Sequence, residues 1–127
     1  MKKYIALFVL LSLFTVLLVA CGGSGGGSGS ASHDVHMNQS NFAQPSITIS
    51  KGDSINLIDD ATVPHIIENG KWDNGIAKNV EESGAPTVNS LQFNGNDSHS
   101  IGPFTTSGTF HFYCTIHENM NLTVTVQ

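Results

Sequence analysis

A thiol, an imidazole and a thioether follow one another at three-residue spacing near the end of the 127-residue chain, as Cys114, His117 and Met120. Together with a second imidazole, such a thiolate, imidazole and weak thioether form the ligand set of a mononuclear copper site for electron transfer. The other histidine in a ligand-like context is His65, which follows Pro64. These residues predict a trigonal plane of the thiolate and the two imidazoles, with Met120 as a weak axial ligand.

An alternating strand and a tight loop are expected to bring these groups together. Phe110, Phe112 and Cys114 recur at period two, which places them on one face of a strand. Residues 122–126 alternate again and predict a second strand. The loop between the two strands would return the imidazole and the thioether towards Cys114.

Each candidate ligand also has a simpler interpretation. Cys114 could be a small buried hydrophobic residue, and Met120 could fill an irregular gap in the core. His117 could be a solvent-exposed loop residue. His65 could be a core or edge histidine, because Pro64 before it and two isoleucines after it only indicate the start of a buried strand.

Residues 112–126 read F-Y-C-T-I-H-E-N-M-N-L-T-V-T-V, and a Pro-His pair stands upstream at 64–65. This pattern resembles the plastocyanin/azurin family of cupredoxins, and the short ligand loop is most similar to that of amicyanin-like members. The resemblance extends from about Val35 to Gln127. It implies one type 1 copper per chain, with four ligands: His65, Cys114, His117 and Met120. Many members carry Asn directly after the first histidine, where this chain has Ile66, so an amide link between the ligand loops is missing.

Short strands dominate the rest of the chain. Period-two runs bounded by turn residues are expected at 33–38, 46–50, 54–58, 65–67, 91–93, 98–101, 110–114 and 122–126. The stretch 68–89 is expected to be irregular, with a short helical turn at 77–81. Seven or eight strands without an amphipathic helix predict an all-β, antiparallel Greek-key sandwich. The metal would lie at one end of that sandwich, held by loops.

The remaining histidines are expected to lie outside the site. His111 alternates out of phase with Cys114 and should face away, as should Tyr113. His99 is expected at the surface. His33 and His36, three residues apart, could bind a second metal.

The net charge excludes some partners. The chain has no arginine, and residues 22–127 carry three lysines against ten acidic residues, a formal charge of −7. A nucleic-acid-binding protein needs a basic face, so that class is excluded. The acidic surface favours redox partners, a donor and an acceptor, with basic docking surfaces. A monomer is expected, with an apolar rim around His117 formed by Pro64, Ile116 and the turn at 103–104.

The N-terminal segment predicts export and lipidation. Residues 1–21 combine a basic start, an apolar run and a lipobox-like end, so cleavage before Cys21 and attachment of a diacylglycerol to it are expected. An ordinary secretory signal and an uncleaved anchor are the alternatives. Residues 22–32 would be a flexible Gly/Ser-rich linker and 33–127 the folded domain. With Cys21 lipidated and Cys114 in the metal site, no intrachain disulfide is expected.

These observations favour an extracytoplasmic electron-transfer protein, anchored to the bacterial cell membrane, over three other classes. A multicopper oxidase or nitrite-reductase-like enzyme needs further histidine-rich copper sites, so the chain is not expected to be an enzyme. A copper-binding or delivery protein without a dedicated redox partner is the closest alternative, although repeated Met or His clusters are missing. A metal-free adhesion sandwich would not need the four ligands. A visible spectrum of the copper-loaded protein distinguishes the first class from the last.

Overall fold

A computed structural model of the chain describes residues 29–127. The expected signal segment, the lipidation site Cys21 and most of the expected linker lie outside the described residues. In the described part all regular structure is β, and it includes no helix with the length and apolar character that crossing a membrane requires. The all-β class expected from the sequence is confirmed.

Nine strands make up the described chain. They are β1 (Ser32–Met37), β2 (Ser46–Ile49), β3 (Ser54–Asp59), β4 (His65–Asp73), β5 (Ile76–Asn79), β6 (Leu91–Phe93), β7 (Ser98–Ile101), β8 (Gly108–Cys114) and β9 (Asn121–Val126).

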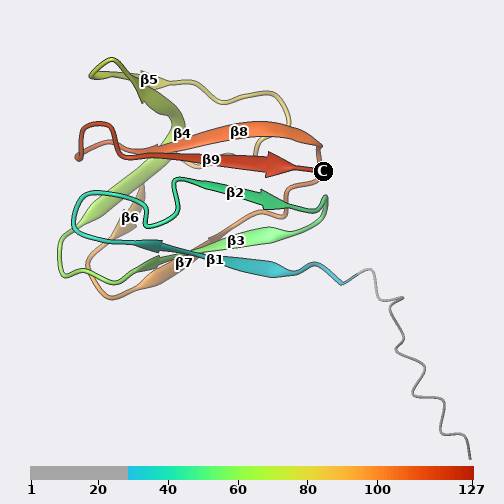
Figure 1. Cartoon of the computed structure of the whole chain (residues 1–127), viewed down its shortest axis with the longest axis horizontal. Helices are drawn as coiled ribbons and strands as arrows, with labels where there is room; N and C mark the ends of the chain where they lie inside the picture. Colours follow the sequence, from blue (N-terminus) through green and yellow to red (C-terminus); the bar gives the residue numbers. More distant parts are fainter. Residues whose placement is uncertain (1–28) are drawn as a thin grey trace, which may run out of the picture.

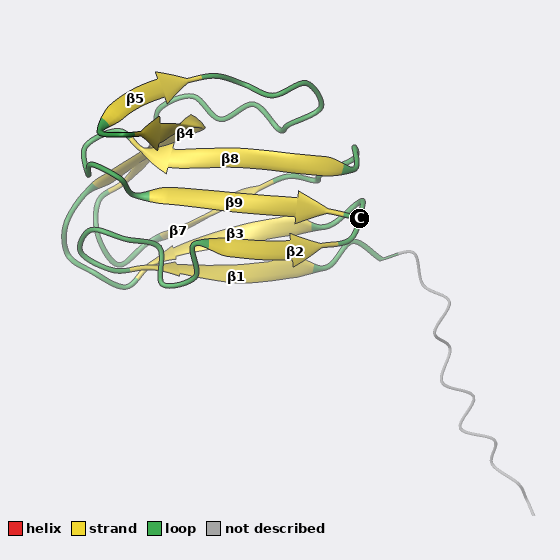
Figure 2. Cartoon of the chain, turned by 45° about the horizontal axis from the view of Figure 1, so that its top comes forward, coloured by secondary structure: helices red, strands yellow, loops and turns green. Residues whose placement is uncertain are grey.

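The strands form two sheets that pack face to face as a sandwich (Figures 1 and 2). One sheet has the order β1-β3-β7, and the other has the order β2-β9-β8-β4-β5, with β6 also paired to β4. The β1–β3 and β2–β9 pairs are parallel, while the remaining pairs are antiparallel. β1 is an edge strand of its sheet. The β3–β4 and β8–β9 loops both lie at the end of the sandwich away from the C-terminus (Figure 1); this end is called the metal end below.

The core follows the alternation of the strands. In β9 every second residue is buried, because one face of the strand packs against the opposite sheet while the other faces outwards. The same pattern runs along β3 and through most of β8. The largest fully buried apolar side chains are Met37, Ile55, Leu57, Ile67, Phe93, Phe104, Phe112, Met120 and Leu122.

The expectation for 68–89 was partly wrong. β4 continues to Asp73 and turns back into β5, so residues 76–79 form a strand rather than part of a helical turn. The turn residues Asn74 and Gly75 both have positive φ, 51° and 74°, which is the conformation of a two-residue hairpin turn. Gly70 lets the two strands approach, since a Cβ there would lie 2.0 Å from the Lys78 carbonyl oxygen. The Asn-Gly pair was the sequence signal for this hairpin.

The end of the sandwich opposite the metal end is called the far end below. The 103–104 turn lies at this far end and not near His117, so the expected position of this turn was wrong. Phe104 is fully buried, and its backbone N–H donates to the Asp53 carbonyl just before β3 begins. Its ring packs 6.0 Å from the rings of both Phe110 and Phe112. Phe104 is therefore a core residue of the far end.

Candidate metal centre

Strand β8 delivers Cys114 to the metal end. Phe110, Phe112 and Cys114 are all buried on its inner face. The chain then turns back at once: the Cys114 N–H donates to the Met120 carbonyl at 3.0 Å, and the Met120 N–H donates to the His117 carbonyl at 3.2 Å. Asn119 has a φ of 62°, a left-handed conformation that Asn tolerates better than most residues. The six-residue return is therefore short and closed by its own hydrogen bonds.

His65 reaches the same place from the opposite direction, as the first residue of β4. The register of β4 with β8 pairs Ile67 with Cys114, so His65 extends past the end of the Cys strand. The Thr115 N–H donates to the Ile66 carbonyl at 2.8 Å. This backbone bond joins the two ligand segments at the position where the family commonly has an Asn side chain.

The three strongest candidates converge in space. The Cys114 Sγ lies 3.7 Å from the His65 Nδ1 and 3.4 Å from the His117 Nδ1. All three atoms lie within 4.8 Å of one another. The two imidazole rings have centroids 4.7 Å apart and are inclined at 56°. Both rings thus turn the same nitrogen, Nδ1, towards the thiol.

The burial of this cluster suits a metal ion. Cys114 and His65 are fully buried and His117 is half-buried. Within the described residues the thiol and the two Nδ1 atoms have hydrogen-bond-range partners only in one another. Burial lowers the pKa of His65, which keeps its ring neutral and its lone pair available. A thiolate and two neutral imidazoles are the donor set that copper prefers.

Met120 completes the loop and is fully buried. Its carbonyl accepts a hydrogen bond from the Cys114 N–H, and its own N–H donates to the His117 carbonyl. The side chain belongs to the metal end of the hydrophobic core. Its axial role stays a prediction.

Trp72 supports the ligand strand, a role that was not predicted from the sequence. Its indole Nε1–H donates to the Cys114 carbonyl at 2.8 Å, and its ring meets Tyr113 edge-on with centroids 6.1 Å apart. The Asn121 side chain bonds the Trp72 backbone twice, accepting from its N–H at 2.7 Å and donating to its carbonyl at 3.0 Å. The β4–β5 hairpin therefore packs against the ligand loop. The Asn74–Gly75 turn was the only local signal of this arrangement.

The outward-facing side chains behave as predicted. His111 turns away from Cys114 and pairs with Glu82 at 2.5 Å. Tyr113 lies on that same outer face, although Trp72 covers it and only 3% of it is exposed. His99 is half-buried rather than fully at the surface, because its ring packs against Phe93.

The possibility that His33 and His36 bind a second metal together gains no support from the structure. His33 pairs with Asp53 at 2.8 Å, and His36 pairs with Asp60 at 2.7 Å. The two carboxylates lie before and after β3, so the histidines have separate partners. In residues 29–127 the only group of three or more His, Cys or acidic side chains close enough to share a metal ion is that of His65, Cys114 and His117.

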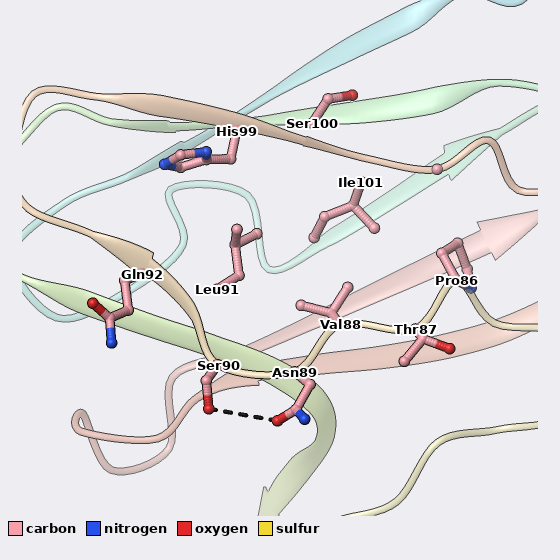
Figure 3. A pocket seen from close by; sticks show the side chains of 11 residues that line it. Pro86, Thr87, Val88, Asn89, Ser90, Leu91, Gln92, His99, Ser100 and Ile101 are labelled. Atoms are coloured by element: carbon pink, nitrogen blue, oxygen red, sulfur yellow. Dashed lines mark hydrogen bonds between the residues drawn. The ribbon is translucent and has the colours of Figure 1, made fainter.

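A groove of about 520 Å³ lies away from this cluster, between the 86–92 segment and β7 (Figure 3). Its walls include Leu91, Val88, His99 and Ile101, with none of the four candidate ligands.

Comparison with known proteins agrees with this geometry. Residues 30–127 match the model of the copper-binding proteins of the plastocyanin/azurin family. No curated protein sequence matches the chain. Among solved structures, amicyanin from Paracoccus versutus (Thiobacillus versutus) is similar with a TM-score of 0.58 at 20% identity, covering 76% of this chain and 81% of that one. A purple cupredoxin from Nitrosopumilus maritimus has a TM-score of 0.57 at 21% identity, covering 75% and 99%. With a matched domain of this extent and a Cys/His cluster at the end of the sandwich, the chain belongs to the plastocyanin/azurin family of copper-binding proteins, the cupredoxins, and its cofactor is copper.

Proposed function

We propose that the protein is a membrane-tethered, extracytoplasmic electron carrier whose single type 1 copper is held by four residues: His65, Cys114, His117 and Met120. Cupredoxins are in general electron carriers that act with redox protein partners outside the cytoplasm. The observation that carries the proposal is the convergence of one thiol and two imidazole Nδ1 atoms within 4.8 Å. When bound, copper supplies a one-electron change between Cu(II) and Cu(I).

The chain's own contribution is a rigid and mostly dry set of donors. Backbone hydrogen bonds close the ligand loop and tie it to Ile66, and Trp72 bonds the Cys114 carbonyl. A donor set that moves little between the two oxidation states keeps the barrier to electron exchange low. No substrate has to enter the site for this electron exchange.

The surface beside His117 supports a docking role. His117 is half-buried, Pro64 is exposed, and Ile116 is 47% exposed, one of three large apolar side chains so exposed in the described chain. An apolar contact of this kind suits the small and short-lived encounters of redox proteins. The formal charge of −7 over residues 22–127 would add long-range attraction to a basic partner.

The decisive experiment for the copper site is optical. Copper-loaded protein should show intense thiolate-to-Cu(II) absorption, and Cys114→Ser should abolish it because an alcohol cannot supply the soft, covalent bond. His111→Ala is the matched control, since this histidine lies in the same strand and faces away; its spectrum should equal that of the wild type. An intense band that survives in Cys114→Ser refutes the ligand assignment.

Electron transfer is tested separately, by stopped-flow exchange with a basic redox protein. The rate should fall as salt rises, and Ile116→Lys should slow the exchange while leaving the copper spectrum intact. A rate indifferent to both changes would favour copper binding or delivery without a redox partner. In that case Ile116 only packs the loop.

The tether concerns residues outside the described part. A diacylglycerol on Cys21 supplies two acyl chains, enough for stable anchoring. Cys21→Ala should therefore move the protein out of the membrane fraction or block its processing. Membrane retention of a correctly cleaved Cys21→Ala protein argues against lipidation.

A further inference from the structure

Strand β3 places a carboxyl group where the fold calls for an apolar side chain. Ile55, Leu57 and Asp59 are its three inward-facing residues, and all are buried. Asp59 is only 1% exposed. Aspartate is almost never fully buried unless it is paired, so this position needs a physical reason.

The partner is the outer edge of the His65 ring. The Asp59 Oδ1 lies 3.7 Å from the His65 Nε2, and both side chains are completely shielded from solvent. The Ala61 N–H donates to the same Oδ1 at 3.0 Å, which orients the carboxyl group. On its other side the ring presents Nδ1 to the Cys114 Sγ at 3.7 Å. The imidazole therefore lies between a thiol and a carboxyl group.

The polar atoms behind His65 are unusually poorly satisfied. Within residues 29–127, three buried side-chain atoms have no hydrogen-bond partner: the His65 Nε2, the Asp59 Oδ2 and the Asp97 Oδ1. Asp59 and Asp97 are neighbours at the end of the β3–β7 ladder, where the Asp59 N–H donates to the Asp97 carbonyl at 2.9 Å. Buried unsatisfied groups cost stability, and native proteins keep few of them outside functional sites.

We propose that Asp59 is a positioning residue for the copper site, which holds His65 as the Nε2–H tautomer and thereby directs the Nδ1 lone pair towards the metal. A neutral imidazole carries one proton, and a carboxylate accepts but does not donate, so the facing carboxylate stabilises the proton on Nε2. Such an outer partner fixes the ring and raises the basicity of the ligand. Its negative charge also favours Cu(II) over Cu(I) and lowers the reduction potential. The inference rests on the proposed ligand role of His65.

A rival acceptor is close by. Burial lowers the pKa of His65, whereas Asp59 and, more weakly, the Asn38 backbone act in the opposite direction. If the Asn38 carbonyl alone held the Nε2 proton, Asp59 would be dispensable for the tautomer. The experiment has to separate these two acceptors.

The tautomer is read in the metal-free protein from the ¹⁵N shifts of the His65 ring, without any dependence on copper. The wild type should show the Nε2–H form. Asp59→Ala should show a mixture of both forms and bind copper about 10- to 100-fold more weakly. Asp59→Asn should retain the Nε2–H form, because its amide oxygen still accepts. An unchanged tautomer in Asp59→Ala would assign the role to Asn38 and overturn the proposal.

The charge effect is read in the copper-loaded protein by redox titration. Asp59→Asn keeps the acceptor and removes the charge, so the potential should rise. Asp60→Asn is the matched control: the same change one residue later, at a carboxylate that is 56% exposed and paired with His36. Its potential should stay close to that of the wild type. Equal potentials for Asp59→Asn and the wild type overturn the electrostatic part. A coloured site that survives in His65→Ala would instead refute the ligand role itself.

Discussion

A buried aspartate lies at each end of strand β3, Asp53 just before its first residue and Asp59 as its last, and their environments are opposite. Asp53, at the far end, is almost fully satisfied: its carboxylate accepts from the Ala31 and Ser50 N–H groups at 3.0 Å and pairs with His33 at 2.8 Å. Asp59, at the metal end, has one oxygen without a partner and faces His65 at 3.7 Å. The carboxylate at one end of β3 thus has partners for both of its oxygens, whereas the carboxylate at the other end has a partner for only one.

The two ends of the sandwich therefore serve different purposes: the far end contributes to stability, and the metal end to the metal site. At the far end the Asp53 carboxylate fastens β1 and the β2–β3 turn, and Phe104 fills the core beside it. At the metal end the same fold accepts under-satisfied polar atoms, because the donors there are arranged for a metal rather than for one another. Substitutions at the far end should therefore lower stability without changing the copper site. Substitutions at the metal end should change the copper site and lower stability less.

The largest effect on stability is expected from Phe104→Ala. This side chain is fully buried against Phe110 and Phe112, so its loss should lower the free energy of unfolding by about 3–5 kcal/mol. Urea unfolding measures this, with the exposed neighbour Thr105→Ala as the control, expected within about 0.5 kcal/mol of the wild type. The copper spectrum should not change. A bleached or shifted spectrum would mean that the two ends are coupled.

Met120→Leu should show the opposite pattern. The two side chains are close in volume, so we expect a loss of less than about 1.5 kcal/mol. Copper should be retained, but the reduction potential should rise because removing a weak donor destabilises Cu(II) more than Cu(I). Redox titration and metal analysis check both points. A protein that no longer binds copper would show that Met120 is a structural plug.

Trp72→Phe tests the support of the ligand strand. The phenyl ring keeps the contact with Tyr113, but the hydrogen bond to the Cys114 carbonyl is lost. We expect a loss of about 1 kcal/mol in the free energy of unfolding, together with a shift of the thiolate-to-Cu(II) band. Visible absorption and urea unfolding are the measurements. An unshifted band would confine Trp72 to a packing role.

The smallest effect concerns acid stability at the far end. Pairing with His33, and then the two backbone N–H groups, lower the pKa of Asp53 below its ordinary value of 3.8. Because the folded pKa lies below the unfolded one, this stabilisation is present above about pH 4 and is lost as the pH falls through the folded value. Urea unfolding of the wild type and Asp53→Asn should therefore show a difference at pH 5 that shrinks towards pH 3. A difference independent of pH would mean that the carboxylate charge is not what fastens β1.

Short-range patterns account for what was predicted correctly. The period-two runs of β3, β8 and β9 predict the sandwich, since alternation depends only on neighbouring residues. The missed hairpin was also a local signal, because Asn74–Gly75 is a typical two-residue turn. Because this turn was not recognised, residues 68–89 were predicted to be irregular, and no position in the fold was predicted for Trp72.

The sequence by itself determined the ligand loop, because Cys114, His117 and Met120 are close enough along the chain for one tight turn to bring them together. Only the tertiary structure decided what surrounds it. The approach of Asp59 to His65, the bond from Trp72 to Cys114 and the distance of Phe104 from the metal end all depend on how the strands and loops are placed relative to one another in space. Trp72 and Cys114 are far apart in sequence, and Asp59 and His65 lie on strands of different sheets. Neither spacing nor hydrophobic alternation encodes which strands become neighbours.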